Sequence, residues 1–248
     1  MKCYCLTFHA ERLETDHTWR LLTGLLTKLR PRGSRATLFV NPENAINLGY
    51  DLRPRIDWLV GQGHEIGQHS HFYVRAPGRP RRTVLTPQNI RDCLERDYEF
   101  LASCGVVPKG FVSGGWAVDP EISRWLAGRK FEYDCTLRTY RLRYDSPPAK
   151  AGDCQKAPFL RGDLLEVPTT AGLRDTLKGQ LLGARQGLRV GDHEYHLYYL
   201  HDYDLDKRAR SVAVRVVETL RKRSELSMTA AELAAKLRGG PLETKAGV

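Results

Sequence analysis

The chain has 248 residues, of which 41% are hydrophobic, and its 39 Lys and Arg outnumber its 29 Asp and Glu to give a net charge of +10. This length suits one sizeable globular domain, and the composition excludes a low-complexity chain. No apolar run approaches the length of a membrane span, and no secretory signal precedes the first predicted strand. If residue 1 is the native start, we therefore expect a cytoplasmic protein.

Predicted strands and helices alternate along the sequence. The strands cover about 3–9, 35–40, 64–69, 110–114, 131–135, 164–167 and 195–201. The helices cover about 16–30, 51–60 and 86–105, a further stretch from 119, and 206–223, with a last short helix after the capping box at 229–232. Seven strands alternating with helices predict a parallel sheet or barrel. We expect one domain over 1–240 and a loose tail over 241–248.

Two other features belong to this outline. The stretch 137–161 is the longest irregular segment, and such a loop in a compact domain is either a functional flap or disordered. Six cysteines fall mostly in predicted strands and helices, so we expect reduced, buried thiols: Cys3, Cys5, Cys93, Cys104, Cys135 and Cys154.

Two histidines stand two residues apart in Gly63-His64-Glu65-Ile66-Gly67-Gln68-His69-Ser70-His71-Phe72-Tyr73. In an extended backbone, side chains at i and i+2 point to the same side. His69 and His71 can therefore reach one divalent ion of the kind that favours nitrogen ligands.

Two further predicted strands end in residues suited to metal or proton chemistry. The first strand ends in His9-Ala10-Glu11, and the last ends in His201-Asp202. In parallel α/β folds the active site lies at the carboxyl ends of the strands. We therefore expect these three strand ends to converge.

These segments resemble the motifs of the polysaccharide deacetylase superfamily, over about residues 3–204. Residues 6–11 are similar to its first motif, Thr-Phe-Asp-Asp or Thr-Phe-Asp-x-Glu, and residues 63–73 to its second, Gly-His-Glu-Ile-Gly-x-His-(Ser/Thr)-x-x-His. Residues 110–116, 131–134 and 200–202 resemble its later segments. The resemblance implies a divergent member with a single-domain, distorted (β/α)7-type barrel and metal-dependent deacetylase chemistry.

The chain departs from the family pattern at four positions. His9 stands in place of the Asp that acts as base, and Ala10 in place of the Asp that binds metal. Tyr73 replaces the distal His, and Val112 replaces the Arg of the third motif. These replacements favour the fold over ordinary deacetylase chemistry, because a fold alone does not determine function.

Applied to the residues present, the resemblance implies a divalent ion, with zinc expected, held by Glu11, His69 and His71. It leaves open whether His71 or Tyr73 completes the site. Neutral His9 would act as the base and protonated His201 as the acid. The alternatives are that His9 is a hydrogen-bonded core histidine and Glu11 a surface carboxylate at a helix start.

Other residues near the strand ends are expected to contact the substrate or to orient the histidines. The expected substrate contacts are Ser113, Trp116 and Arg138. Those expected to orient or support the ligands are Tyr73, Asp134 and Glu166. Trp116 has packing as its alternative role.

The basic surplus is concentrated in two clusters, over 75–82 and 138–143. Arginine binds phosphate and carboxylate through two parallel hydrogen bonds, so an anionic small substrate is one interpretation. A solvated loop that keeps the protein soluble is the other. Nucleic acid is disfavoured, because no aromatic platform is interleaved with the basic residues.

The function expected from these features is removal of an acetyl or other acyl group from an amino sugar or a related small molecule. Two alternatives stay open. One is a sugar epimerase or another non-hydrolytic enzyme on the same scaffold, which would explain the missing Asp and Arg. The other is a catalytically inactive binding protein. The sequence does not determine the oligomeric state.

Overall fold

The computed structural model describes residues 3–74, 82–139, 157–172, 195–222, 226–240 and 243–245. Within them an 11-stranded sheet runs in the order β10-β11-β1-β2-β3-β6-β7-β9-β8-β13, with β12 paired to β1. The main strands are β1 (Cys3–Ala10), β2 (Ala36–Val40), β3 (Glu65–Ser70), β6 (Gly110–Ser113), β7 (Tyr133–Asp134), β9 (Leu164–Glu166) and β11 (Tyr195–His201). The remaining strands are β8 (Phe159–Arg161), β10 (Ala171–Gly172), β12 (Leu226–Met228) and β13 (Glu243–Lys245).

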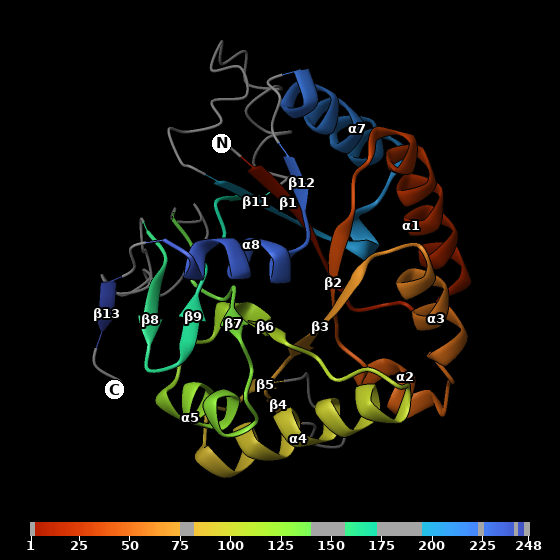
Figure 1. Cartoon of the computed structure of the whole chain (residues 1–248). Helices are drawn as coiled ribbons and strands as arrows, with labels where there is room; N and C mark the ends of the chain where they lie inside the picture. The colour runs from red at the N-terminus through yellow and green to blue at the C-terminus, as the bar shows by residue number, and fades with distance from the viewer. Residues whose placement is uncertain are drawn as a thin grey trace.

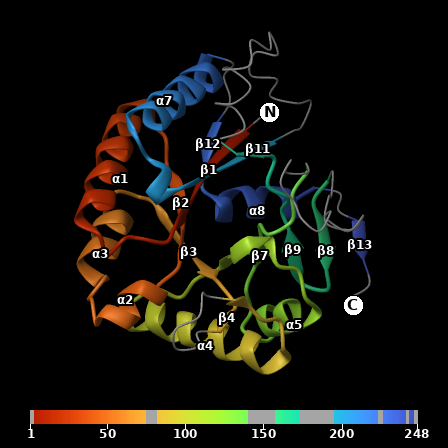
Figure 2. The same cartoon turned by 180° about the vertical axis from the view of Figure 1, so that it is seen from behind.

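The sheet curls into a distorted barrel whose helices lie outside it (Figure 1). The helices are α1 (Asp16–Leu29), α2 (Glu43–Leu48), α3 (Arg53–Gly61), α4 (Pro87–Ser103), α5 (Pro120–Gly128), α7 (Lys207–Lys222) and α8 (Ala230–Arg238). Of the sheet's strand pairs, only β8 and β9 are antiparallel. After β9, Thr169 bridges to Arg138 and the Thr170 N–H donates to the Leu197 carbonyl, so this segment runs from the β7 side of the sheet to β11. The opposite side is seen in Figure 2.

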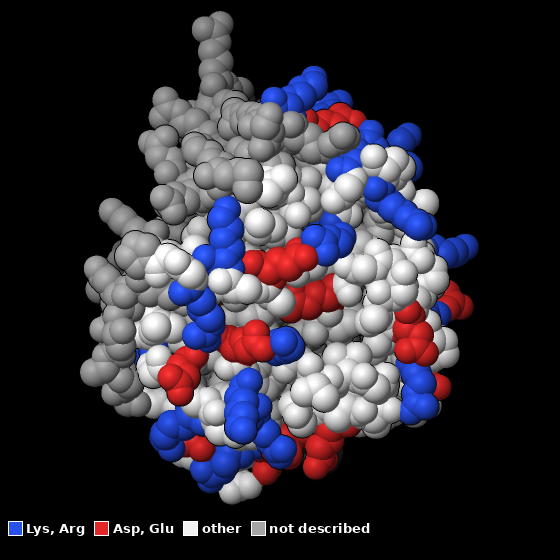
Figure 3. Space-filling model, in the orientation of Figure 1, with Lys and Arg blue, Asp and Glu red and all other residues white. Residues whose placement is uncertain are grey.

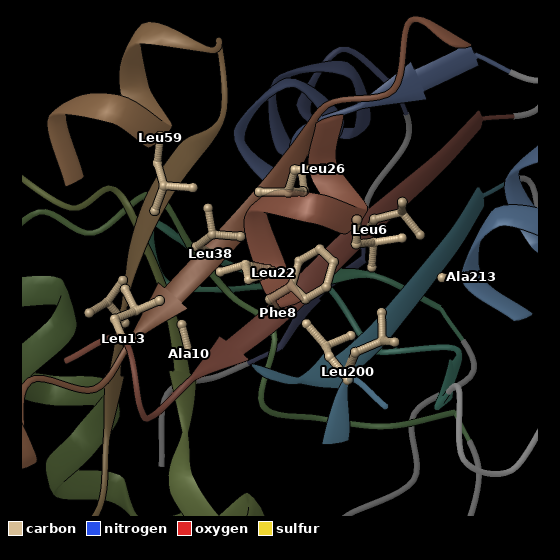
Figure 4. Packing of buried hydrophobic residues seen from close by; sticks show 14 of the residues in the cluster. Leu6, Phe8, Ala10, Leu13, Leu22, Leu26, Leu38, Leu59, Leu200 and Ala213 are labelled. Carbon is tan, nitrogen blue, oxygen red and sulfur yellow. The ribbon is translucent and has the colours of Figure 1, made fainter. Parts of the chain in front are cut away.

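Side chains of β1 alternate between two layers, as the pleat of a strand requires. Leu6, Phe8 and Ala10 point to the helices and pack in a cluster with leucines of α1 (Figure 4). Cys3 and Cys5 point into the barrel. The same alternation continues past the strand end, so it places His9 and Glu11 on the inner side and Ala10 in the outer core.

Helix α8 lies across the amino-terminal end of the barrel (Figure 1). The N–H of Ala231 in its first turn donates to Glu65 Oε2 at 2.9 Å, and the Tyr133 hydroxyl donates to Glu65 Oε1 at 2.5 Å. A helix N-terminus favours a carboxylate, so this partly buried network covers one end of the barrel and leaves the carboxyl end of the strands for chemistry.

Most predicted helix starts are confirmed in the structure. Thr86 caps α4 by accepting from Asn89 N, and Asp119 caps α5 by accepting from Glu121 N. Thr229 and Glu232 form the predicted capping box of α8. Five of the six cysteines lie in the described part of the chain, and all five are buried thiols that form no disulfide there.

The structure adds elements that the sequence did not predict. Helix α2 has six residues and strands β8 and β12 three each, too short to show a clear hydrophobic period. Strand β13 lies within 241–248, where we expected a loose tail, and pairs with β8 because that edge of the sheet is otherwise open. Of the predicted loop 137–161, residues 140–156 lie outside the described part, and residues 159–161 form β8.

On the face that carries α8, basic and acidic side chains are interspersed (Figure 3). Ion pairs join Arg35 to Glu232 at 2.7 Å and Lys109 to Glu132 at 2.8 Å. The positive charge is thus locally balanced there. Among the helices that the structure describes, none is both long and apolar enough to cross a membrane.

Candidate metal centre

The ends of β1, β3 and β11 converge inside the barrel, as the sequence predicted. His9 of β1 pairs in register with His201 of β11 and lies on the same side as His69 of β3. The His9 ring centroid is 4.8 Å from that of His69 and 5.1 Å from that of His201. Three imidazoles from strands far apart in the sequence therefore meet at one end of the barrel.

Glu11, His69 and His71 form a compact group of ligating atoms. Glu11 Oε1 lies 3.4 Å from His69 Nε2 and 3.4 Å from His71 Nε2. One ligand atom from each residue lies within 4.8 Å of the other two. Within the described part of the chain, these three side chains form a group that could hold a metal ion.

The orientation of His69 fits a metal ligand. Its Nδ1 lies 2.9 Å from the Val112 carbonyl oxygen, which can only accept, so Nδ1 carries the proton and Nε2 presents its lone pair. Among the described residues, neither His69 Nε2 nor His71 Nε2 makes a hydrogen bond of ordinary geometry, and both lie 3.4 Å from Glu11 Oε1. The Nε2 lone pair of His69 and the Glu11 carboxylate thus converge beside His71 Nε2, an arrangement that suits a divalent ion.

Protonation favours the same interpretation. Burial lowers the pKa of His69 below its usual value despite the opposing effect of Glu11, so the imidazole is neutral at pH 7. Burial acts to raise the pKa of Glu11, but the two imidazoles outweigh burial and hold that pKa well below its usual range. A neutral histidine and an ionised carboxylate are the forms that bind metal.

His71 is confined on two sides. Its ring stacks on Tyr73, with centroids 4.8 Å apart and planes 13° apart. On another side it abuts Gly114, where an added Cβ would lie 2.3 Å from His71 Nδ1. The structure thus places Tyr73, predicted either as a ligand or as a support, against the ring of His71.

His9 is enclosed by other rings and is 3% exposed. Tyr199 stacks against it at 5.1 Å, and Trp116 lies 5.4 Å away. Burial lowers the pKa of His9 well below its usual value, and the neighbouring His69 and His201 lower it further. The imidazole is therefore neutral at pH 7 and able to accept a proton.

His201 lies between two carboxylates at the rim of the site. Its Nε2 is 3.8 Å from Glu11 Oε1, and its Nδ1 is 3.4 Å from Asp204 Oδ2. Its ring also stacks on Tyr203 at 4.8 Å. Both ring nitrogens of His201 thus face a carboxylate oxygen, whereas His9 is enclosed by other rings.

Trp116 forms one wall of the site. The Arg138 guanidinium carbon lies 4.9 Å above its ring, and Tyr199 packs edge-on at 4.9 Å. Trp116 has φ of 58°, in the left-handed region that non-glycine residues rarely occupy. Such backbone conformations cost about 1–3 kcal/mol and are concentrated at functional sites.

Three other predicted residues lie away from the histidines. Ser113 is buried, and its N–H donates to Thr136 Oγ1 at 2.8 Å, so that N–H is not available to a substrate. Asp134 accepts from the Thr136 hydroxyl at 2.5 Å, and Glu166 accepts from Arg161 Nε at 2.8 Å. Asp134 therefore reaches the site only through Thr136 and the Ser113 backbone, and the described contacts join neither carboxylate to a histidine.

Several residues of the site were not predicted from the sequence, namely Gly114, Tyr199 and Asp204. Tyr199 could have been found from strand alternation, because it lies two residues before His201 on the same face of β11. Gly114 lies in the segment 110–116 that resembles a family motif, and Asp204 stands three residues after His201, but neither spacing indicated a contact with a histidine of the site. The two arginine clusters are described only at Arg82 and Arg138, and their other members lie outside the described residues.

No protein-family model and no curated protein sequence matches the chain. Solved structures do. A Mycobacterium smegmatis protein described as a polysaccharide deacetylase superposes with a TM-score of 0.65 at 18% identity, covering 98% of this chain and 93% of that chain. A family 4 acetyl xylan esterase from Clostridium thermocellum, in complex with a cobalt ion, superposes with a TM-score of 0.59 at 18% identity and covers 98% of this chain and 94% of that chain.

A CE4 family pseudoenzyme from Bacillus anthracis is also similar, with a TM-score of 0.61 at 12% identity over 94% of this chain and 66% of that chain. These similarities confirm the distorted (β/α)7-type barrel that the sequence implied. The chain has the fold of the polysaccharide deacetylases and carbohydrate esterases. At this low identity the similarity shows the fold alone. Esterases and a pseudoenzyme both have this fold, so the fold does not decide whether the chain is active.

Proposed function

We propose that the chain is a metal-dependent hydrolase that removes an acetyl group from an amino sugar or a related sugar-containing molecule. The observation that carries this proposal is the position of Glu11 Oε1, 3.4 Å from Nε2 of both His69 and His71. The fold supports it, because structures with this fold include a family 4 carbohydrate esterase bound to acetate and a peptidoglycan N-acetylglucosamine deacetylase.

In this proposal Glu11, His69 and His71 hold a divalent ion, with zinc or cobalt as candidates. Such an ion, when bound, polarises an acyl carbonyl and makes a nearby water molecule more acidic. His69 is kept in the tautomer that presents Nε2 by the Val112 carbonyl, and Tyr73 and Gly114 keep the ring of His71 in place.

The two remaining histidines divide the proton transfers. Neutral His9, 4.8 Å from His69 by ring centroids, takes a proton from the attacking water. His201, between Glu11 and Asp204, gives a proton to the departing amine. Enclosure by Trp116 and Tyr199 excludes bulk water from His9, which strengthens the electrostatic effect of the ionised groups around it.

The test is metal analysis together with acetate release from N-acetylglucosamine oligomers. We expect about one divalent ion per chain and acetate release that chelation abolishes. His69→Ala should lose both the ion and the activity. His17→Ala, which removes an exposed imidazole from α1, should lose neither. Wild-type protein that takes up no divalent ion from excess zinc or cobalt would refute the proposed site.

A second candidate is a binding protein that has kept the metal but lost catalysis. It is favoured by the replacement of the family's Asp and Arg with His9 and Val112, and by the pseudoenzyme that shares the fold. Wild-type protein that binds one ion and binds chitooligosaccharides without releasing acetate would support this candidate. Conversion of a sugar to its epimer, with no acetate released, would instead support the epimerase alternative.

A further inference from the structure

The peptide unit that follows Glu11 is held at both of its polar atoms. Glu11 lies one residue beyond the end of β1, so no strand neighbour fixes it. Its carbonyl oxygen accepts from Asn44 Nδ2 at 3.0 Å, and the N–H of the same peptide, on Arg12, donates to Asp202 Oδ2 at 2.9 Å. Asp202 is fully buried. Side chains from α2 and from the end of β11 thus fix one peptide from opposite sides.

The connection that leads into α2 also holds the second ligand. Asn41 Nδ2 donates to the His69 carbonyl at 3.0 Å, and the Asn41 N–H donates to the Ala10 carbonyl at 2.9 Å. The side chain of Asn41 accepts in turn from the Glu43 N–H at 3.2 Å. Asn41 and Asn44, three residues apart, therefore bond to the backbones of His69 and Glu11.

The need for such a brace follows from the position of the carboxylate. Ala10, where the resembled family places its ligand Asp, points into the outer core with Phe8 and Leu38 (Figure 4). The carboxylate must come from the next inward position, Glu11, which is outside the strand and has one more rotatable bond than Asp. Without an external restraint, ordering that side chain and its backbone would cost conformational entropy each time an ion bound.

We propose that Asn44 is a positioning residue for the metal site, which holds the Glu11 backbone so that Oε1 faces both imidazoles. Together with Asn41 it sets the distance between the carboxylate and His69. This inference rests on the proposed metal site. It differs from a purely structural role for Asn44, because its amide donates to a carbonyl outside α2, on the residue that carries the proposed ligand.

The experiment measures cobalt affinity by calorimetry and the cobalt absorption spectrum of the full chain. Asn44→Ala should weaken cobalt binding about tenfold to a hundredfold, the usual effect of removing a group that orients a ligand. Its spectrum should change, because Glu11 would no longer be held in one geometry. Asn47→Ala is the matched control: Asn47 lies in the same helix and donates to the Glu43 carbonyl at 2.6 Å, away from the ligands. It should leave affinity and spectrum unchanged.

The outcomes separate this inference from the proposed function. No cobalt binding by the wild type refutes the metal site itself. Wild-type binding, with equal affinity and spectrum in Asn44→Ala, overturns the positioning role alone. If Asn44→Ala does not fold, Asn44→Asp provides the same test, because it keeps the volume and suits the first turn of a helix but cannot donate to the Glu11 carbonyl. Unchanged cobalt binding in that variant also overturns the inference.

Discussion

Gly114→Ala tests whether the confinement of His71 matters for metal binding. An added Cβ would lie 2.3 Å from His71 Nδ1 and 2.4 Å from Cγ, whereas ordinary contacts begin at 3.4 Å. The new Cβ is bonded directly to the backbone and cannot move aside, so the ring of His71 must move by about 1 Å. Tyr73 is stacked on the ring at 4.8 Å and limits the directions in which it can retreat.

A displacement of this size should move Nε2 away from the position that it shares with His69 Nε2 and Glu11 Oε1. We expect zinc and cobalt affinity to fall about tenfold to a hundredfold, which corresponds to about 1.4 to 2.8 kcal/mol. Calorimetric titration of the metal-free protein measures the affinity, and thermal unfolding of the same sample reports whether the fold is kept.

Gly128→Ala in α5 provides the control. A Cβ there would meet nothing within 4 Å, and neither glycine has a positive φ, so only Gly114→Ala introduces a clash. The control should bind metal like the wild type. If Gly114→Ala folds and binds metal with unchanged affinity, then His71 is not a ligand, and Tyr73 becomes the residue to test.

Three further predictions concern acid catalysis, substrate contact and buried charge. His201→Ala should retain metal but lower kcat about a hundredfold or more, and His201→Asn should be nearly as impaired. Normal turnover of the Asn variant would show that His201 only orients other groups. Arg138→Ala should raise KM for an anionic substrate with little change in kcat, and an unchanged KM would exclude that contact. Burial raises the pKa of Asp97 from 3.8 to about 6. As the pH rises from about 4 to 6, Asp97 of the folded chain therefore keeps a proton that the unfolded chain has released. The free energy of unfolding should fall by about 3 kcal/mol over that range. Asp97→Asn should lack that component of the pH dependence, and equal urea-unfolding profiles of the two proteins would contradict it.

The sequence predicted those parts of the site that depend on local periodicity. Pairs two residues apart on one side of an extended chain, such as His69 and His71, can be recognised without a structure. The same rule explains why Glu11 and not Ala10 joins them, since His9 and Glu11 share the inner side of the strand end.

Contacts between distant segments could not be predicted in this way. Nothing near Asn44 indicates that its amide reaches the Glu11 carbonyl, and α2 is too short to show a helical period. Asp134 and Glu166 stand at strand ends like the histidines. However, they pair with Thr136 and Arg161, since their side chains point away from the barrel interior, opposite to Tyr133 and Leu165.

The pairing of β1 with β11 has a consequence for when the site forms during folding. β1 lies between β2, which follows it closely in the chain, and β11, which follows only after most of the chain. Non-local pairings of this kind form late, because a long loop must close before their contacts can compensate for its lost entropy. Glu11, His69 and His71 come from the first third of the chain, whereas His201 and Asp202 arrive with β11. During refolding, cobalt absorption should therefore appear before acetate release, and cobalt affinity should reach its full value only after Asp202 has arrived to hold the Arg12 N–H.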